Sequence, residues 1–271
     1  MATIVILEHL LQREVELPYM VYGLAARWRA RGHRVLVHHG TEDPPAGDLA
    51  IVNVDLSLIP ESYRELFARY PRVVNGAVLD VSKRRFSRDL LDRHSDWIGP
   101  VIVKTDANYG GRPERLLRQA AERAGLACDV PPGPLALEYP IYRALREVPD
   151  EVWDSPGLVV ERFLPERDEA GYYVRVWVFL GDRDRSTRWR ASGPVVKAGN
   201  LLERIPVEVP DELRAWRARL QFDFGKFDYV RHGNRWVLLD VNRTPAYPLP
   251  DAGAADPVLQ TLAPGIEFYL R

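Results

Sequence analysis

The chain has 271 residues, 46% of them hydrophobic and 28% charged, which is the composition of a globular protein with enough core for two or three packed units. Its 37 basic and 38 acidic residues are interleaved and leave a net charge of −1, which argues against a broad nucleic-acid or membrane-surface footprint. The one cysteine excludes an intrachain disulfide and a multi-cysteine zinc site, and neither a secretory signal nor a membrane-spanning run is present, so we expect a cytoplasmic protein.

Strands and helices alternate over the first 80 residues. Helix 17–32 is expected from Pro18 in its first turn and Gly32 after its last. A second helix is expected at 60–70, and short strands at 3–7, 33–39, 49–55 and 72–75. Near-continuous apolar strands separated by helices predict a parallel sheet covered on both faces, an α/β domain over residues 1–78.

Two common phosphate-binding loops are missing from the sequence. The turn after the first strand, EHLLQREVELP, has no glycine, so a Rossmann dinucleotide site is not expected. No GxxxxGK[ST] motif occurs either, because Gly225-Lys226 lacks the preceding glycine. A phosphate site must therefore be built in another way.

The rest of the chain predicts mixed α and β structure in two further subdomains, 79–160 and 161–271. In the first we expect helices at 82–94 and 113–125 and strands at 99–106 and 157–166, the last running past residue 160. In the second we expect a strand at 172–182, a basic turn region at 182–193, a short strand at 194–199, a helix at 211–221, and a hairpin that turns at 232–234.

Oxygen-bearing side chains gather on the predicted hairpin. The stretch WVLLDVNRTPAYP places Asp240 and Asn242 on one strand face, because they lie two residues apart. Asp228 on the partner strand lies at a comparable distance from the turn. Three such side chains suit Mg²⁺, which takes carboxylate and amide oxygens. The alternative is that Asp240 and Asn242 only cap the strand before Pro245.

Lysines and glutamates mark other strand ends. Lys104 ends the apolar VIVK strand, where an ammonium group needs an anion or must reach the strand edge, and two glycines follow it closely. Lys83 starts a predicted helix. Glu161 and Glu166 flank an apolar strand end that could face a purine and a ribose. Taken singly, each is equally typical of a solvated helix start or an edge strand.

The order of these pieces resembles the ATP-grasp superfamily, which includes D-alanine–D-alanine ligase, glutathione synthetase and related carboxylate–amine ligases. The set comprises a lysine before a VIVK strand, a glycine loop, ExFLxE, a strand with arginine, FGKFD and LLDVNxxP. The resemblance covers about residues 75–250, and residues 1–75 are similar to the small α/β domain that precedes it. It implies an ATP-grasp fold in which two α+β subdomains clasp ATP.

The resemblance also implies a role for each matching residue. Lys83 and Lys104 would contact the ATP phosphates, and Tyr109, Gly110 and Gly111 would form the loop that covers them. The adenine would lie against Glu161, Arg162, Phe163 and Leu164, and the ribose would bind Glu166. Arg175 would point to the phosphates and Arg243 would orient the acceptor carboxylate. Asp228, Asp240 and Asn242 would hold one or two Mg²⁺ ions, for which Mn²⁺ is a substitute.

Three features depart from the superfamily pattern. Asp240 stands where the family usually has glutamate, and the glycine loop runs directly into a predicted helix instead of a strand. The short segment 183–200 carries five basic residues, namely Arg183, Arg185, Arg188, Arg190 and Lys197. These side chains either form a solvated hairpin or bind an acidic co-substrate.

The implied activity is ATP- and Mg²⁺-dependent ligation of a small-molecule or peptide carboxylate to an amine or other nucleophile through an acyl phosphate. No nucleophilic side chain is required for such a reaction. Two alternatives stay open: a kinase that phosphorylates a small molecule, and a nucleotide-binding regulatory protein without turnover. We expect no nucleic-acid or membrane partner, and a homodimer is left open.

Overall fold

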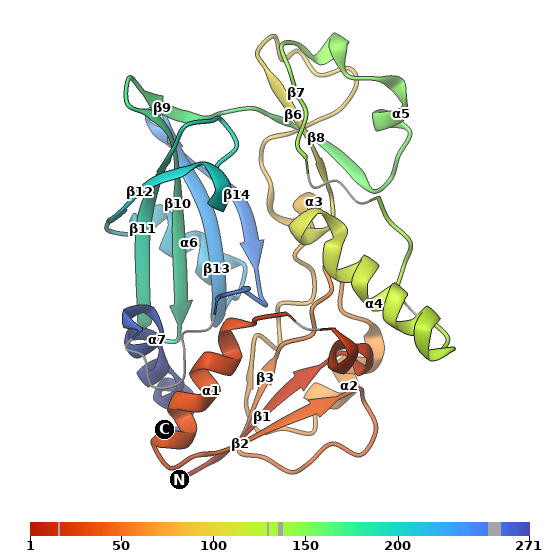
Figure 1. The fold of residues 1–271 in the computed structure, drawn as a ribbon, viewed down its shortest axis with the longest axis vertical. Coiled ribbons are helices and arrows are strands. Elements are labelled where there is room, and N and C mark those ends of the chain that lie inside the picture. Colours follow the sequence, from red (N-terminus) through yellow and green to blue (C-terminus); the bar gives the residue numbers. More distant parts are fainter. Residues whose placement is uncertain (16, 129, 135–137, 249–255) are drawn as a thin grey trace.

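Three β-sheets form the framework of the computed structural model, which describes residues 1–15, 17–128, 130–134, 138–248 and 256–271 (Figure 1). One sheet is parallel, and the other two consist of antiparallel pairs. The fold class is therefore mixed α/β, as the sequence predicts. The domain boundaries at residues 78 and 160 remain a prediction.

The first sheet is parallel and has the strand order β2-β1-β3-β4. Its strands are β1 (Thr3–Glu8), β2 (Arg34–His39), β3 (Leu49–Val52) and β4 (Val73–Val74), with helices α1 (Met20–Ala30) and α2 (Glu61–Phe67) and a 3-10 turn at Leu10–Glu14 between them. Ile4 and Ile6 pack with α1, whereas Val5 and Leu7 pack with α2. The predicted parallel sheet with two covered faces is confirmed.

The second sheet has the order β5-β8-β6-β7 and lies above the first in Figure 1. Its strands are β5 (Leu90–Leu91), β6 (Val101–Thr105), β7 (Ile141–Tyr142) and β8 (Leu158–Arg162). The same part of the chain contains helices α3 (Lys83–Phe86), α4 (Arg112–Ala124) and α5 (Asp150–Trp153) and 3-10 turns at Asn108–Gly111 and Leu145–Glu147, and α4 packs in the core of the first sheet. The predicted helix 82–94 is wrong after Phe86. Asp89 is 5% exposed and accepts two hydrogen bonds from Arg235, and β5 pairs with β8, so tertiary partners override local helix propensity.

The third sheet has the order β12-β11-β10-β13-β14, with β9 paired to β10. Its elements are β9 (Glu166–Asp168), β10 (Gly171–Leu180), β11 (Arg183–Ala191), a 3-10 turn at Ala198–Asn200, β12 (Leu201–Pro206), α6 (Asp211–Arg219), β13 (Phe224–His232) and β14 (Arg235–Asn242). Leu213 and Trp216 of α6 cover one face of this sheet, where they pack with Trp177 and Phe227. The predicted helix 211–221 and the terminal hairpin are confirmed.

Two predictions for residues 182–199 are wrong. The basic segment 182–193 is not a turn region but the regular strand β11, and the predicted strand 194–199 contains no strand residues. Arg188 and Arg190 pair with Glu166 and Glu203 along the sheet, which allows a strand rich in charge to lie between two others. The edge strand β12 was not predicted.

A β-bulge changes the register of the β13–β14 hairpin. The two strands pair His232 with Arg235 at the turn and Tyr229 with Leu238 further on, and then Asp228 with Asp240. The extra residue is Leu239. Because a bulge lets two neighbouring residues face one side, Leu239 and Asp240 both line the same cleft.

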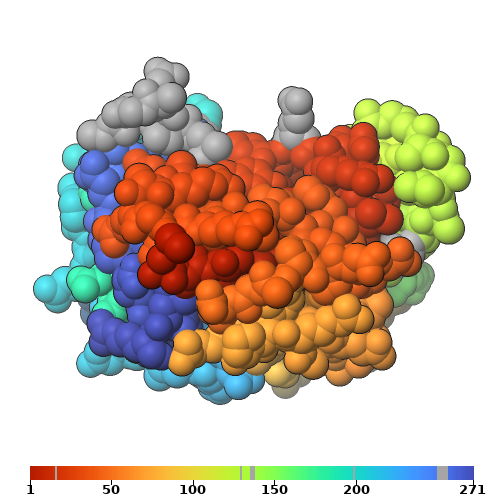
Figure 2. All heavy atoms as spheres, turned by 90° about the horizontal axis from the view of Figure 1, so that it is seen from below, coloured from red at the N-terminus to blue at the C-terminus, as the bar shows by residue number. Residues whose placement is uncertain are grey.

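The two ends of the described chain pack against each other. Helix α7 (Pro257–Leu262) and the 3-10 segment Ala263–Tyr269 lie beside α1, so the C-terminal residues in blue adjoin the N-terminal residues in red and orange (Figure 2). Trp28 Nε1 donates to the Ala263 carbonyl at 2.9 Å, and His33 Nε2 lies 3.1 Å from Glu267 Oε1.

Among the described helices none has the length and apolar character to cross a bilayer.

The residues after β14 connect the third sheet to the segments that follow β3 and β4 of the first sheet, which together with that sheet are called the first unit below. Arg243 is 1% exposed, and its guanidinium donates to the backbone carbonyls of Val78 and Leu56. Burial lowers the pKa of Arg243 to about 10. Next to it, Thr244 Oγ1 donates to Asp55 Oδ1 at 2.5 Å.

We expect Arg243→Met to lower the free energy of unfolding by about 3 kcal/mol, because buried carbonyl acceptors lose their donor. Urea denaturation measures this loss. The control Arg31→Met, at an exposed position, should change stability by less than about 0.5 kcal/mol. Wild-type stability in Arg243→Met would contradict the structural role.

We also expect stability to depend on pH through Asp55. Burial raises its pKa from 3.8 to about 6, so the folded protein binds this proton more tightly than the unfolded chain. The contribution is present below pH 4 and is lost as pH rises through 6, by up to about 3 kcal/mol. The free energy of unfolding, measured by urea denaturation, should change less between pH 4 and pH 7 in Asp55→Asn than in the wild type. Equal differences would rule out this assignment.

Candidate functional site

A cleft of about 570 Å³ lies between the second and third sheets. Strands β6 and β8 form one wall and strands β10, β11, β13 and β14 form the other. One end is apolar and is lined by Ile102, Phe163, Leu164, Val174, Val176, Trp189, Val195, Val196, Val230 and Leu239. The other end is charged and is lined by Lys83, Lys226, Asp228 and Asp240, with Tyr109, Arg112 and Tyr139 around them. An apolar pocket that opens onto fixed charges suits a ligand with a flat ring and an anionic tail.

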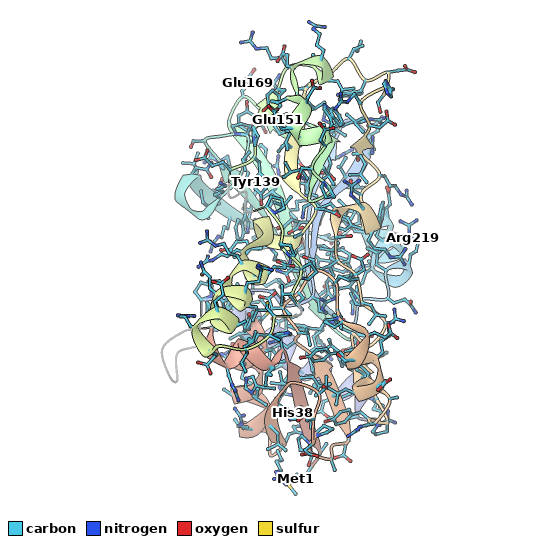
Figure 3. The ribbon with its side chains drawn as sticks, turned by 90° about the vertical axis from the view of Figure 1, so that its right-hand side faces the viewer. Met1, His38, Tyr139, Glu151, Glu169 and Arg219 are labelled. Atoms are coloured by element: carbon cyan, nitrogen blue, oxygen red, sulfur yellow. The ribbon has the colours of Figure 1, made fainter. Side chains whose placement is uncertain are left out.

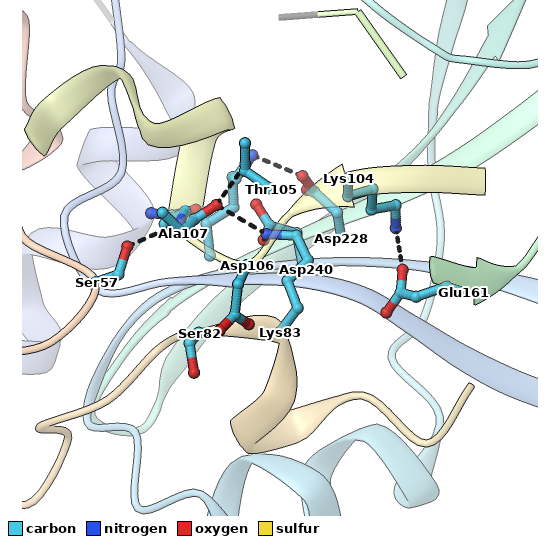
Figure 4. A network of polar contacts seen from close by, with 12 residues as sticks. Ser57, Ser82, Lys83, Lys104, Thr105, Asp106, Ala107, Glu161, Asp228 and Asp240 are labelled. Atoms are coloured by element: carbon cyan, nitrogen blue, oxygen red, sulfur yellow. Dashed lines mark hydrogen bonds and ion pairs between the residues drawn. The ribbon is translucent and has the colours of Figure 1, made fainter. Parts of the chain in front are cut away.

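Two lysine–aspartate pairs form the charged end. Asp228 and Asp240 are directly opposite each other on β13 and β14. Lys83 Nζ lies 3.1 Å from Asp240 Oδ1 (Figure 4). Lys226 Nζ lies 2.8 Å from Asp228 Oδ2. Lys226 and Asp228 are two residues apart on one strand and therefore point to the same face. Each carboxylate has its own ammonium group.

Electrostatics keeps these lysines charged. Burial alone would lower the pKa of Lys83, but Asp240 outweighs it and the pKa is raised overall. Burial alone would also lower the pKa of Lys226. The nearby carboxylates of Asp228 and Asp240 outweigh this effect, and the pKa is raised overall. Burial raises the pKa of Asp228, while Lys226 lowers it in part. The cleft therefore presents two fixed ammonium groups at neutral pH.

The carboxylate pair has oxygen atoms suited to a hard cation. Asp228 Oδ1 is buried and accepts no hydrogen bond from the described residues. Two opposed carboxylates plus phosphate and water oxygens fit the octahedral preference of Mg²⁺. In the described ranges no group of three or more His, Cys, Asp or Glu side chains could hold a metal. Asn242 Oδ1 accepts a hydrogen bond from Thr244 N at 2.8 Å and is not among the residues that line the cleft, so its role as a third ligand stays a prediction.

A third ion pair joins the two strands β6 and β8 that form one wall of the cleft. Lys104 Nζ is 2.6 Å from Glu161 Oε2, and the two side chains are 10% and 5% exposed (Figure 4). Glu161 Oε1 is buried without a hydrogen-bond partner among the described residues. Arg162, Phe163 and Leu164 follow Glu161 and line the cleft. The structure thus brings together most residues that the resemblance assigns to nucleotide binding.

Three of the predicted residues lie elsewhere. Glu166 accepts hydrogen bonds from Arg175, Arg188 and the backbone N–H of Arg231. Arg175 lies over the Trp236 ring, 5.0 Å from its centroid, and does not line the cleft. Arg243 is buried in the contact with the first unit. The structure gives these three residues protein partners instead of a place in the cleft.

The glycine loop borders the charged end in an unusual backbone conformation. Tyr109, Gly110 and Gly111 have φ values of 47°, 69° and 75°, all in the left-handed region. A Cβ at Gly111 would lie 2.7 Å from the Pro134 carbonyl oxygen, so only glycine fits there. Helix α4 begins at once with Arg112, which confirms the predicted loop-to-helix order, and Arg112 Nη1 donates to Tyr109 Oη at 2.9 Å. The loop holds Tyr109, 45% exposed, at the cleft mouth.

Two arginines of β11 already have acidic partners within the chain. Arg188 pairs with Glu166 and lies 3.5 Å from the centroid of the Tyr173 ring, and Arg190 pairs with Glu203. These contacts neutralise two of the five basic residues that were candidates for binding an acidic co-substrate, whereas Lys197 lines the cleft.

Sequence reasoning missed several residues of the cleft. Lys226 had a usable signal, because the two-residue spacing from Asp228 already predicts a shared strand face. Tyr139 and Trp189 had none, since their places depend on how distant segments pack. Tyr139 lies between Glu151 and His38 along the long axis of the molecule and is nearer to Glu151 (Figure 3). Burial raises the pKa of the Tyr139 hydroxyl, and Asp240 adds to the effect, so it stays a neutral phenol.

Comparison with known proteins shows that the fold of this chain is similar to several solved structures, although no protein-family model and no curated protein matches its sequence. The ATP-grasp ligase PsnB, complexed with minimal precursor, Mg and ADP, has a TM-score of 0.58 at 14% identity over 99% of this chain and 97% of its own. A RimK domain protein ATP-grasp from Sphaerobacter thermophilus gives 0.53 at 15% identity over 100% of both chains. Macrocyclase MdnC from Microcystis aeruginosa, bound with precursor peptide MdnA, gives 0.51 at 10% identity over 99% of this chain and 100% of its own.

We expect Lys104→Met to lower the free energy of unfolding by about 3 kcal/mol, because it leaves the Glu161 carboxylate buried without its cation. The double variant Lys104→Met/Glu161→Gln should recover most of this loss, since it removes both charges. Urea denaturation of the four proteins of the cycle gives the coupling energy. A double variant as unstable as the sum of its single changes would contradict the ion pair.

Proposed function

We propose that this chain, which has the ATP-grasp fold, is an ATP- and Mg²⁺-dependent ligase that joins a carboxylate to an amine or other nucleophile. The observation that carries the proposal is the cleft itself. It combines an apolar end, a buried Lys104–Glu161 pair and the opposed Asp228 and Asp240 with their two lysines. A purine nucleotide with a metal-bound triphosphate has the matching chemistry.

In this proposal the adenine lies at the apolar end, against Phe163 and Leu164, and the triphosphate extends toward Lys83 and Lys226. Lys104 lies between the two regions, and its pairing with Glu161 orients both side chains toward the nucleotide. The loop of Tyr109, Gly110 and Gly111 covers the phosphates through its backbone N–H groups. Glu166, Arg175 and Arg243 are left out because each is already bound within the protein.

Asp228 and Asp240 are the residues that would hold Mg²⁺. The bound cation would withdraw charge from the phosphate oxygens. The γ-phosphoryl group passes to the substrate carboxylate, and the nucleophile then displaces phosphate from the acyl phosphate. Lys83 and Lys226 stabilise the charge that spreads over the transferred group, and their carboxylate partners keep them protonated at the charged end of the cleft until the nucleotide binds. Positioning and charge neutralisation suffice, so no side chain acts as a nucleophile.

An ADP-release screen tests the proposal. The assay supplies ATP and Mg²⁺ with amino acids, small peptides and hydroxy acids, alone and in pairs. Peptides are included because PsnB and MdnC are each described with a precursor peptide. ADP and phosphate released only when carboxylate and nucleophile are both present would support a ligase. A stable phosphorylated product would instead identify a kinase.

We expect Asp228→Asn to reduce ADP release by roughly 100-fold and to weaken Mg²⁺–ATP binding, because it removes a charged oxygen ligand. Calorimetric titration with Mg²⁺ and a non-hydrolysable ATP analogue measures the binding. The control Asp96→Asn changes an exposed aspartate of the same chain and should leave both values unchanged. Parental affinity in Asp228→Asn would remove this residue from the metal site.

A further inference from the structure

The carboxylates of the proposed metal site are already neutralised by this chain's own cations. Lys226 Nζ lies 2.8 Å from Asp228 and Lys83 Nζ lies 3.1 Å from Asp240. Lys83 is held further by the Ala107 carbonyl at 3.5 Å and is 4% exposed. Two negative charges are therefore balanced by two positive charges within one end of the cleft.

This balance disfavours a divalent cation on its own. A cation that bound Asp228 and Asp240 would lie next to two ammonium groups and would leave the cleft with an excess of positive charge. A nucleotide on its own would bring phosphate charge near both aspartates. When nucleotide and cation arrive together, the ammonium groups can turn to phosphate oxygens and the carboxylates become available to the cation.

We propose that Lys83 and Lys226 are built-in counter-ions that make divalent-cation binding at Asp228 and Asp240 dependent on nucleotide. This inference rests on the proposed nucleotide and metal site. It adds that the cation binds to this site only together with the nucleotide. Since coupling between two ligands is reciprocal, the cation must strengthen nucleotide binding by the same factor. The bare enzyme thereby avoids holding a metal without its substrate.

Lys226 is the residue on which the inference can be tested. Its side chain is 26% exposed, whereas that of Lys83 is 5% exposed and packed at the start of α3. Removal of the Lys226 charge therefore perturbs the fold less and leaves the Asp228 carboxylate without its cation.

Mn²⁺ is the probe, and the electron paramagnetic resonance signal of free Mn²⁺ measures its binding without any turnover. The wild type should bind Mn²⁺ weakly alone, and saturating ADP should tighten binding by roughly 10- to 100-fold. Lys226→Met should bind Mn²⁺ alone about tenfold more tightly than the wild type, and the effect of ADP should shrink accordingly.

Two control variants separate the contact from general charge. Lys226→Arg keeps the cation and should retain the wild-type coupling. Lys197→Met removes a positive charge from the same cleft, where the ammonium lies 5.6 Å from the Tyr139 ring centroid, and should leave Mn²⁺ affinity unchanged. Thermal unfolding checks that each variant is folded, and Lys226→Gln removes the same charge if Lys226→Met is not.

Two results would overturn the inference. If Mn²⁺ and ADP bind together but Lys226→Met, or Lys226→Gln in its place, keeps the wild-type affinity for Mn²⁺ alone, the counter-ion role fails while the proposed nucleotide–metal site stands. If the wild type binds neither Mn²⁺ nor ADP, the inference and the proposed function fail together.

Discussion

Two carboxylates that face each other across neighbouring strands stay ionised together only if cations lie beside them, because otherwise one of them takes up a proton. Asp228 and Asp240 are such a pair, and like charges in this position repel. Lys226 supplies one cation from the same strand. Lys83 supplies the other from α3, 157 residues before Asp240, and its ion pair holds the second unit against the third sheet. The cleft between the two sheets thus depends on the same charges on which the proposed metal and phosphate site rests.

The bulge at Leu239 places the carboxylates of Asp228 and Asp240 opposite each other. Counting from the turn pair His232–Arg235, a regular hairpin would place Asp228 opposite Leu239 and would turn Asp240 to the other face. The extra residue restores Asp240 to the cleft and keeps Leu239 there as well. An apolar side chain and a carboxylate therefore stand next to each other, at the border between the apolar and charged ends. No glycine or proline marks the bulge in the sequence LLDVN, so strand periodicity alone does not reveal it.

The sequence predicts the parts of the fold that follow from local patterns. The parallel first sheet, the strand with Lys104, the loop-to-helix order and the terminal hairpin all carry regular apolar spacing or clear turn residues. The failures concern charged residues whose partners lie far away in sequence. Segment 182–193 looks like a solvated turn because its arginines have no visible partners, yet Arg188 stacks on Tyr173 and pairs with Glu166. Arg243, which the resemblance assigns to the acceptor carboxylate, is buried and donates to the carbonyls of Val78 and Leu56, which lie far away in sequence.

Hydrogen bonds connect the end of β14 to Asp55 and Tyr19, which lie outside the third sheet. Thr244 N donates to Asn242 Oδ1, and Thr244 Oγ1 donates to Asp55 Oδ1, whose other oxygen accepts a hydrogen bond from Tyr19 Oη. This chain of bonds connects Asn242, two positions after Asp240, to Tyr19, which directly precedes helix α1. Burial of Asp55 is unfavourable, as its raised pKa shows, and its retention requires the compensating bonds. A change that loosens the first unit would therefore shift Asp240 relative to Lys83, because both the strand end and its cation are fixed from outside the third sheet.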